Sequence, residues 1–359
     1  MTGSRPVAAN LPRIIVPIDR MLAPCLDPVA DQLVAAGCRV ARPATDTPLG
    51  WPELDGVDVA VLTPRTKFAG PEIAAAPRLK GIVFPTIGVE ALDLAAADAA
   101  GLAVGHGATT EAIESMAEAN VMLMAVLMLD LPGKSRALRE RGWRDGTVRA
   151  RMMRGRTIGF VGFGRIARAT LRRLANWGVN AAYFDPHVGE DAAQEARATR
   201  IADLPTLLRT SDIVNVLAEL TAQTHGMIGA AEIAMMRRDA CLVNTARGAV
   251  VDEAALAQAL REGVIAGAAL DAFATEPLAA DSPLRTLDNV ILTPHNIGHT
   301  RELMDSFVPA TYENVVRIAA GEPPLYFKNP QVLPKWRARL ARLAPMDRDE
   351  ISAHRAGSL

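Results

Sequence analysis

Short apolar runs rich in Val and Ile alternate with helix-like segments over most of the chain. The first series lies between residues 13 and 107 and consists of "RIIVPI", "CRVARP", "VDVAVLTP", "LKGIVFP" and "LAVGHG". Segments such as "DPVADQLVAAG" and "EALDLAAADAAG" separate these runs. Strands that alternate with helices form parallel sheets covered by helices on both faces. The pattern therefore predicts an α/β fold.

A second series of the same kind begins at residue 156. Its runs are "RTIGFVGFG", "VNAAYFDP", "SDIVNVLAE", "DACLVNTARG", "IAGAALDAF" and "NVILTPH", and a helix-like segment over residues 300–321 follows them. The chain has 359 residues, which is long for a single hydrophobic core. We expect two domains, each built on a doubly wound parallel sheet.

Composition and charge argue against several classes of protein. The net charge of −1 gives no electrostatic case for binding nucleic acid. Cys25, Cys38 and Cys241 form no CxxC pair, so they indicate neither disulfides nor a metal site. The N-terminus has no apolar signal segment, and the apolar run of residues 121–129 is too short to span a bilayer. We therefore expect a cytoplasmic protein that binds no nucleic acid, membrane or metal.

Two segments leave alternatives open. Residues 111–131 predict one long helix that ends at "LPGK" and is apolar almost all round over residues 121–129. It lies either between domains or in an oligomer interface, or it is a plain core helix. The proline- and arginine-rich tail, residues 331–359, contains "WRARLARL", which can form a short amphipathic helix. For this tail we favour a loosely ordered segment.

A glycine-rich turn lies between a predicted strand and a predicted helix. In "TIGFVGFGRIARATL", Gly162 permits a tight turn, Gly164 lets the backbone approach a pyrophosphate, and Ala167 allows close helix packing. The next strand ends in Asp185, 23 residues past Gly162, where a carboxylate binds the adenosine ribose. A carboxylate there would repel a 2′-phosphate, so the sequence favours NAD over NADP. The alternative is a structural glycine turn with a surface aspartate.

Polar residues follow three consecutive strands of the second series. These are Arg247, Asp271 with Glu276 five residues later, and His295. Ligands bind outside the carboxyl ends of strands in open parallel sheets. Arg247 offers a bidentate fork to a substrate carboxylate, and His295 can donate or accept a proton. Glu276 would raise the pKa of His295, and Asp271 could orient the nicotinamide carboxamide. The set predicts hydride transfer to a 2-keto acid, although each residue alone has an ordinary structural explanation.

The segment "CLVNTARGAVVDE" surrounds the predicted arginine. We interpret Gly248 as the turn that frees Arg247 and Asp252 as the N-cap of the following helix. No GxSxG motif is present, and none of the cysteines lies at such a strand end. Nucleophilic catalysis is therefore disfavoured.

The motifs "LVNTARG.VVDE.AL..AL" and "AGAALD.F..EPL" resemble those of the D-isomer-specific 2-hydroxyacid dehydrogenases, over nearly the whole chain to about residue 330. The resemblance implies a discontinuous, flavodoxin-like substrate domain (1–112 and 300–330), a Rossmann NAD-binding domain (113–299) and a C-terminal tail (331–359). It implies Arg247, Glu276 and His295 as catalytic residues and a homodimer as the assembly. It also implies substrate binding by the loop around Gly88. The NAD contacts that it implies are Arg165, Ile166, Asp185, Thr245, Ala246, Asp271, His295 and Gly298.

The sequence departs from the family pattern in places. Leu217 and Glu219 replace a common His-x-Pro beside the cofactor, and Thr63 replaces an arginine of phosphoglycerate-type members, with Arg65 two residues on. Two other functions stay open. One is an NAD-sensing corepressor-like binding protein, and the other is a formate- or phosphite-type dehydrogenase on the same scaffold.

Overall fold

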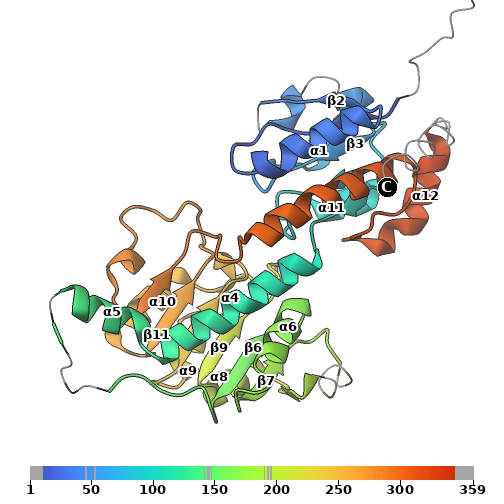
Figure 1. Cartoon of the computed structure of the whole chain (residues 1–359). Coiled ribbons are helices and arrows are strands. Elements are labelled where there is room, and N and C mark those ends of the chain that lie inside the picture. The colour runs from blue at the N-terminus through green and yellow to red at the C-terminus, as the bar shows by residue number, and fades with distance from the viewer. Residues whose placement is uncertain are drawn as a thin grey trace, which may run out of the picture. The chain divides into compact units, whose positions relative to one another are not determined.

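The computed structural model describes residues 11–343, except residues 45–46, 52–53, 141, 144–145, 147, 190, 192–193 and 195. The chain divides into two compact units (Figure 1). The terminal unit joins the residues up to Ala112 to those from Thr300 onward, and the central unit is Ile113–His299. Each unit contains one sheet of parallel strands, which confirms the predicted α/β class with two parallel sheets.

The sheet of the terminal unit has the strand order β2-β1-β3-β4-β5. Its strands are β1 Arg13–Ile15, β2 Arg39–Ala41, β3 Val59–Val61, β4 Gly81–Val83 and β5 Ala103–Gly105. The helices of this unit are α1 Ala23–Ala35, α2 Gly70–Ala75, α3 Leu94–Ala100, α11 Arg301–Ala319 and α12 Leu333–Arg342. All five strands lie within the apolar runs that predicted them.

Both faces of this sheet are buried, because successive side chains of a strand point to opposite faces. Ile14 and Val59 belong to the core shared with α1 and α11, which pack along each other (Figure 1). Ile15 and Ala60 belong to the opposite core, shared with α2 and α3. This two-sided burial explains why the runs are continuously apolar and do not alternate with polar residues.

Helix α12 corrects the expectation of a loosely ordered tail. Trp336 is only 1% exposed, and its Nε1 donates to the carbonyl of Lys80 at 2.7 Å. The guanidinium of Arg339 donates to three backbone carbonyls, those of Leu79, Pro77 and Ala100. A large buried aromatic ring and a multiply bonded arginine fix the helix on the terminal unit. The expectation was thus wrong for residues 331–343, and residues 344–359 lie outside the described residues.

The sheet of the central unit has the order β12-β11-β10-β9-β6-β7-β8. Its strands are β6 Thr157–Val161, β7 Asn180–Phe184, β8 Thr199–Arg200, β9 Ile213–Val216, β10 Cys241–Asn244, β11 Gly267–Leu270 and β12 Val290–Leu292. Its helices are α5 Leu131–Arg139, α6 Arg165–Arg173, α8 Leu204–Thr210, α9 Ala230–Met235 and α10 Glu253–Glu262. The chain runs outward from β6 through β7 and β8 and then returns to β9 on the other side of β6. The topological switch point therefore lies between β6 and β9.

Helix α4 (Thr110–Met128) and α6 cover one face of the central sheet, and α8, α9 and α10 cover the other (Figure 1). Leu123 and Met124 of α4 are buried in the core of this unit, whereas Met122 is 45% exposed. The sequence predicted that the long helix ends at "LPGK", but this segment begins a second helix, α5. Pro132 lies in the first turn of α5, where proline is well tolerated.

No single helix among the described residues is long and apolar enough to cross a membrane. In this described part of the chain, only α4 taken together with α5, with a bend of 61° between them, has the length and composition for a broken span.

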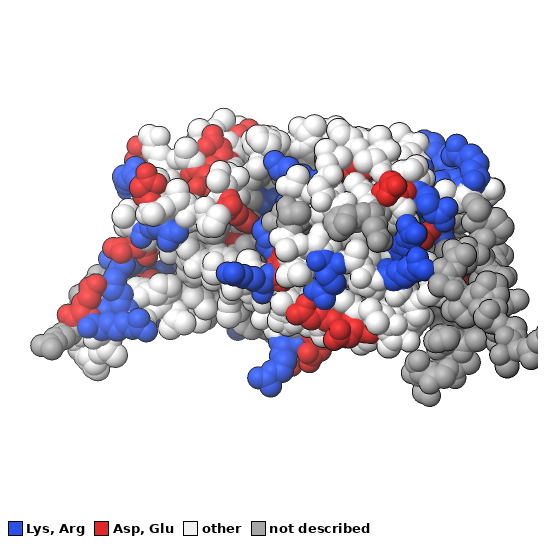
Figure 2. Space-filling model, turned by 90° about the horizontal axis from the view of Figure 1, so that it is seen from above, with Lys and Arg blue, Asp and Glu red and all other residues white. Residues whose placement is uncertain are grey.

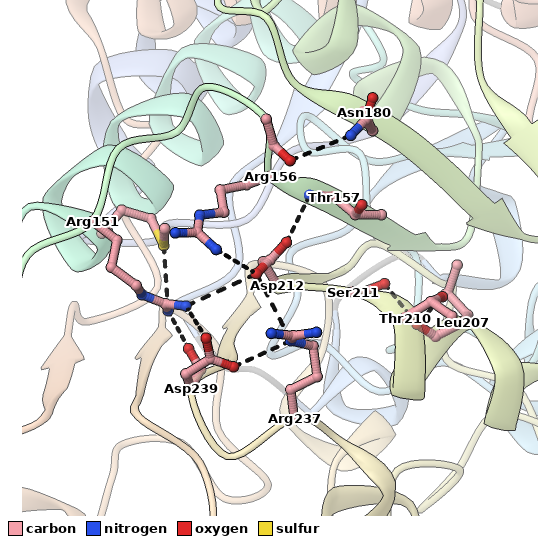
Figure 3. Close-up of polar contacts among 12 residues, drawn as sticks. Arg151, Arg156, Thr157, Asn180, Leu207, Thr210, Ser211, Asp212, Arg237 and Asp239 are labelled. Atoms are coloured by element: carbon pink, nitrogen blue, oxygen red, sulfur yellow. Dashed lines mark hydrogen bonds and ion pairs between the residues drawn. The ribbon is translucent and has the colours of Figure 1, made fainter.

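An ion-pair network lies at the amino edge of the central sheet, where β6, β9 and β10 begin (Figure 3). Asp212 pairs with Arg156 at 3.3 Å, and Asp239 pairs with Arg151 at 2.7 Å and with Arg237 at 3.1 Å. Asp212 also accepts the first backbone N–H of β6. Because ligands bind at the opposite, carboxyl edge of such sheets, we assign this network to the stability of the fold.

Candidate active site

The turn after β6 occupies the switch point of the central sheet. Gly162 has φ +88°, and a Cβ there would lie 2.7 Å from the backbone nitrogen of Ala218 in the loop after β9. A side chain at this position is excluded by the backbone conformation and by the neighbouring loop. The predicted tight turn is therefore present, and the segment of Leu217 and Ala218 packs directly on it.

The turn leads into the N-terminus of α6. Gly164 is the N-cap residue, and a Cβ on it would point into open space, while Ala167 is fully buried against the sheet. The backbone N–H groups at Arg165 and Ile166, in the first turn of the helix, are suited to an anion. These residues fit the pyrophosphate of a dinucleotide.

Asp185 follows β7 and is half-buried. Its Oδ2 accepts the backbone N–H of Phe163 and its Oδ1 accepts that of His187, both at 2.8 Å. A carboxylate has about four lone-pair sites, so two remain for ribose hydroxyls. Asp185 thus also holds the glycine turn in place, a second role that the sequence did not indicate.

The structure brings Glu276 and His295 into direct contact. Nδ1 of His295 lies 2.8 Å and 2.9 Å from the two carboxylate oxygens of Glu276, and Glu276 also accepts the N–H of Phe273 at 3.0 Å. The hydrogen bond to Glu276 raises the pKa of His295, although burial opposes this. Burial raises the pKa of Glu276, but the bonds from His295 and Phe273 outweigh it, so that pKa is lowered. The pair therefore favours an imidazolium beside a carboxylate.

Asp271 supports the loop that carries His295. It is 3% exposed, and a single oxygen, Oδ1, accepts from the Thr293 hydroxyl at 2.7 Å and from the N–H groups of Asn296 and Ile297 at 3.0 and 3.1 Å. Burial raises the pKa of Asp271, although these bonds oppose the shift. His295 itself has φ +53°, a strained conformation for a non-glycine residue that the surrounding bonds maintain.

Arg247 precedes the short helical turn Gly248–Val250, and its Nη1 donates to the carbonyl of Ala246 at 2.7 Å. Its charge acts on both members of the pair, lowering the pKa of Glu276 and opposing the rise in the pKa of His295. The guanidinium therefore lies within electrostatic range of the two titratable groups. The three predicted catalytic residues gather on the loops that follow β10, β11 and β12.

Gly248 begins the helical turn Gly248–Val250, and a tertiary contact gives a second reason for a glycine there. Its backbone is not left-handed; instead, a Cβ would lie 1.9 Å from the carbonyl carbon of Phe273. The close approach joins the loop of Arg247 to the loop of Glu276. The predicted N-cap is present, since the Asp252 carboxylate accepts the N–H of Ala255 at 3.0 Å.

The remaining predicted cofactor residues lie at the same edge. Thr245 is 8% exposed and follows β10, ahead of Ala246, and Gly298 packs against Met116 of α4. The Thr245 hydroxyl bonds to Asn120, a residue that sequence reasoning missed because α4 is distant in the chain. Gly88, the predicted substrate-binding residue, belongs to the terminal unit, where it follows β4.

Taken together, the central unit presents a dinucleotide-type turn beside a fixed cation and an imidazole paired with a carboxylate. Among the described residues, no group of three or more His, Cys, Asp or Glu side chains could hold a metal ion. Such a site can bind a carboxylate and move a proton next to a nicotinamide. The fold and the site define the class of dinucleotide-dependent dehydrogenases.

Comparisons with known proteins agree with this class. Residues 121–296 match the family described as D-isomer specific 2-hydroxyacid dehydrogenase, NAD binding domain. A glyoxylate reductase from Thermofilum pendens is 36% identical over 265 residues, which cover 72% of this chain and 77% of that protein. A D-3-phosphoglycerate dehydrogenase from Methanocaldococcus jannaschii is 33% identical over 270 residues, 75% of this chain. This chain spans only about half of that protein, 51%.

Among solved structures, the NADPH-dependent glyoxylate/hydroxypyruvate reductase of Sinorhizobium meliloti, in complex with NADP and malonate, is similar to this chain. The TM-score is 0.78 at 27% identity, and the match covers 90% of this chain and 98% of that one. The chain belongs to the D-isomer specific 2-hydroxyacid dehydrogenase family.

The Glu276–His295 pair predicts a pH dependence for reduction of a keto acid. If the protonated imidazole donates the proton, kcat/KM should fall as the pH rises through the raised pKa of His295. Glu276→Gln removes the carboxylate, lowers that pKa and should move the falling limb to lower pH. Three other charged or titratable groups interact electrostatically with His295: Arg247, Asp271 and His299. This variant leaves all three unchanged. The control is Glu262→Gln on the exposed end of α10, and a limb that stays in place in Glu276→Gln would contradict the assignment.

Proposed function

We propose that the protein is an NAD-dependent oxidoreductase that transfers a hydride between NAD(H) and a small D-2-hydroxy acid or 2-keto acid. The contact between Glu276 and His295, on loops next to that of Arg247, is the observation that carries the proposal. The glycine turn at Gly162 and the carboxylate of Asp185 support dinucleotide binding at the same sheet edge.

In the proposed mechanism, the Arg247 guanidinium grips the substrate carboxylate and fixes the keto carbon in place. When bound, the nicotinamide supplies or accepts the hydride. His295 gives the proton on Nε2 to the carbonyl oxygen during reduction, and takes it back during oxidation. Glu276 stabilises the imidazolium through Nδ1, so that a proton is available near neutral pH.

We propose an unphosphorylated substrate, as in the relatives named for glyoxylate or hydroxypyruvate. Arg65 follows β3 in the terminal unit and is ion-paired with Asp19, which is 7% exposed. An arginine neutralised by a buried carboxylate is a weaker ligand for a phosphate. We also propose that the backbone at Gly88, in the loop after β4, takes part in substrate binding, as the family resemblance implies.

We also propose a homodimer in the cytoplasm. Four large apolar side chains of α4, α5 and their junction are at least 45% exposed: Met122, Leu129, Leu131 and Leu138. Trp143, Val148 and Met152 in the following segment are more than 70% exposed. Clustered exposed apolar residues mark interaction surfaces.

On the face in Figure 2, Lys and Arg lie interspersed with Asp and Glu, which favours a small-molecule substrate over nucleic acid.

The role of Arg247 is tested by Arg247→Ala. The variant should lose about a hundredfold or more in kcat/KM for a 2-keto acid, because a bidentate charged contact is lost, while NADH still binds. Arg247→Lys keeps the charge without the fork and should fall between. The control is Arg261→Ala, which changes an exposed residue of α10. Activity should be measured as NADH oxidation with glyoxylate, hydroxypyruvate, pyruvate and phosphohydroxypyruvate, and as NAD reduction with formate. Largely intact keto-acid activity in Arg247→Ala would refute the clamp.

The preference for NAD is tested at Asp185. Asp185→Asn keeps an acceptor for the glycine turn but removes the charge that repels a 2′-phosphate. The ratio of kcat/KM for NADPH to that for NADH should rise by roughly tenfold. Asp203→Asn, which changes an exposed helix-capping aspartate of the same unit, is the matched control. An unchanged ratio in Asp185→Asn would remove Asp185 from the ribose site.

A further inference from the structure

Three buried polar side chains are linked beneath the carboxyl edge of the central sheet. Asn120 lies on α4, Asn215 on β9 and Thr245 after β10; the two asparagines are 0% exposed. Oδ1 of Asn120 accepts from Nδ2 of Asn215 at 2.7 Å and from the Thr245 hydroxyl at 3.0 Å. Nδ2 of Asn120 donates to the carbonyl of Met116 at 2.7 Å.

These bonds fix the direction in which the Thr245 hydroxyl points its proton. A backbone carbonyl only accepts, so the amide nitrogen of Asn120 must face Met116. Its oxygen then faces Thr245, and a hydroxyl next to an amide oxygen must donate. The lone pairs of the Thr245 oxygen are left as acceptors. Asn120 therefore determines that Thr245 presents an acceptor at the sheet edge.

The network is not one that stability alone would favour. Oδ1 of Asn215 is buried and has no hydrogen-bond partner among the described residues. An unsatisfied buried acceptor destabilises the folded state. The neighbouring strand residues Ile213 and Val243 lie in the same layer and are apolar. A polar cluster kept in such a layer points to a role beyond packing.

The position of Thr245 suggests that role. With NAD(H) held at Gly162 and Asp185, the pyrophosphate and the adenosine ribose would lie at the ends of β6 and β7. The nicotinamide half would then lie on the side of β9 and β10, toward His295. Its carboxamide has two N–H donors. Asp271, whose three bonds all end on Oδ1, offers Oδ2 to one of them, and the Thr245 oxygen can accept the other.

We propose that Asn120 is a positioning residue for the cofactor: it holds the Thr245 hydroxyl as an acceptor for the nicotinamide carboxamide. This assignment rests on the proposed function, in that it requires NAD(H) to bind at the central unit. It adds a determinant of nicotinamide orientation that lies on α4 and touches the cofactor only through Thr245.

The test is calorimetric binding of three ligands: NADH, the reduced 3-acetylpyridine analogue, which has a methyl group in place of the carboxamide nitrogen, and ADP-ribose, which lacks the nicotinamide. The wild type should bind NADH more tightly than the acetylpyridine analogue. Asn120→Ala should reduce this preference by about three- to tenfold, the worth of one hydrogen bond, and leave the Kd of ADP-ribose unchanged. Thr245→Val should do the same, and the double variant should lose no more than either single one.

Two further variants separate positioning from folding. Asn120→Ser retains a side-chain oxygen and should restore part of the preference for NADH. Asn329→Ser disrupts a buried amide network in the terminal unit and should lower stability without changing that preference. Unaltered preference in Asn120→Ala, or equal weakening of NADH and ADP-ribose, would overturn the assignment. Failure of the wild type to bind any of the three ligands would instead refute the proposed cofactor, and the assignment with it.

Discussion

The hydrogen-bonded pair of Glu276 and His295 joins two loops that follow neighbouring strands, and the rest of the candidate site is arranged around it. The N–H of Phe273 fixes the Glu276 carboxylate, and Asp271 fixes the turn that carries His295. Gly248 lets the loop of Arg247 pack against the same backbone. The proposed proton donor and carboxylate clamp are therefore set by the ends of β10, β11 and β12 as one unit.

The same edge of the sheet holds the features that fit a dinucleotide. Asp185 accepts a backbone N–H of the glycine turn, so the residue proposed to select NAD also stabilises the pyrophosphate loop. On the other side of the switch point, Asn120 and Thr245 link α4 to the end of β10. Charged residues at the opposite edge, around Asp212, are paired with one another and belong to the framework (Figure 3).

The strands and the polar residues at their ends were predictable from the sequence, because both depend on a local pattern of residues. Doubly buried strands are continuously apolar, so every run that was recognised contains a strand. Among the described residues, only the two-residue, exposed strand β8 was missed. Arg247, Glu276 and His295 were recognisable because polar residues are unexpected at the ends of core strands. The acceptor role of Asp185 toward Phe163 and the bond between Asn120 and Thr245 were not predictable, because each depends on how distant segments meet.

Two further features that the sequence did not predict have the same origin. Helix α12 was underestimated because its stability comes from Trp336 and Arg339 binding carbonyls more than 230 residues away in the chain. At Gly248 the sequence indicated a turn but not the close approach of the Phe273 backbone, which excludes a side chain there and is not visible in the local sequence. In both places a tertiary contact decides the structure.

The proton-holding role of the Glu276–His295 pair is tested most directly by the pKa of His295 in the wild-type protein. This pKa can be measured by NMR titration of the Cε1 proton, assigned by comparison with His295→Gln. We expect a pKa above the ordinary imidazole value of about 6.5, because Glu276 stabilises the charged ring. A pKa at or below that value would show that the pair does not hold a proton for transfer, and would contradict the proposed mechanism.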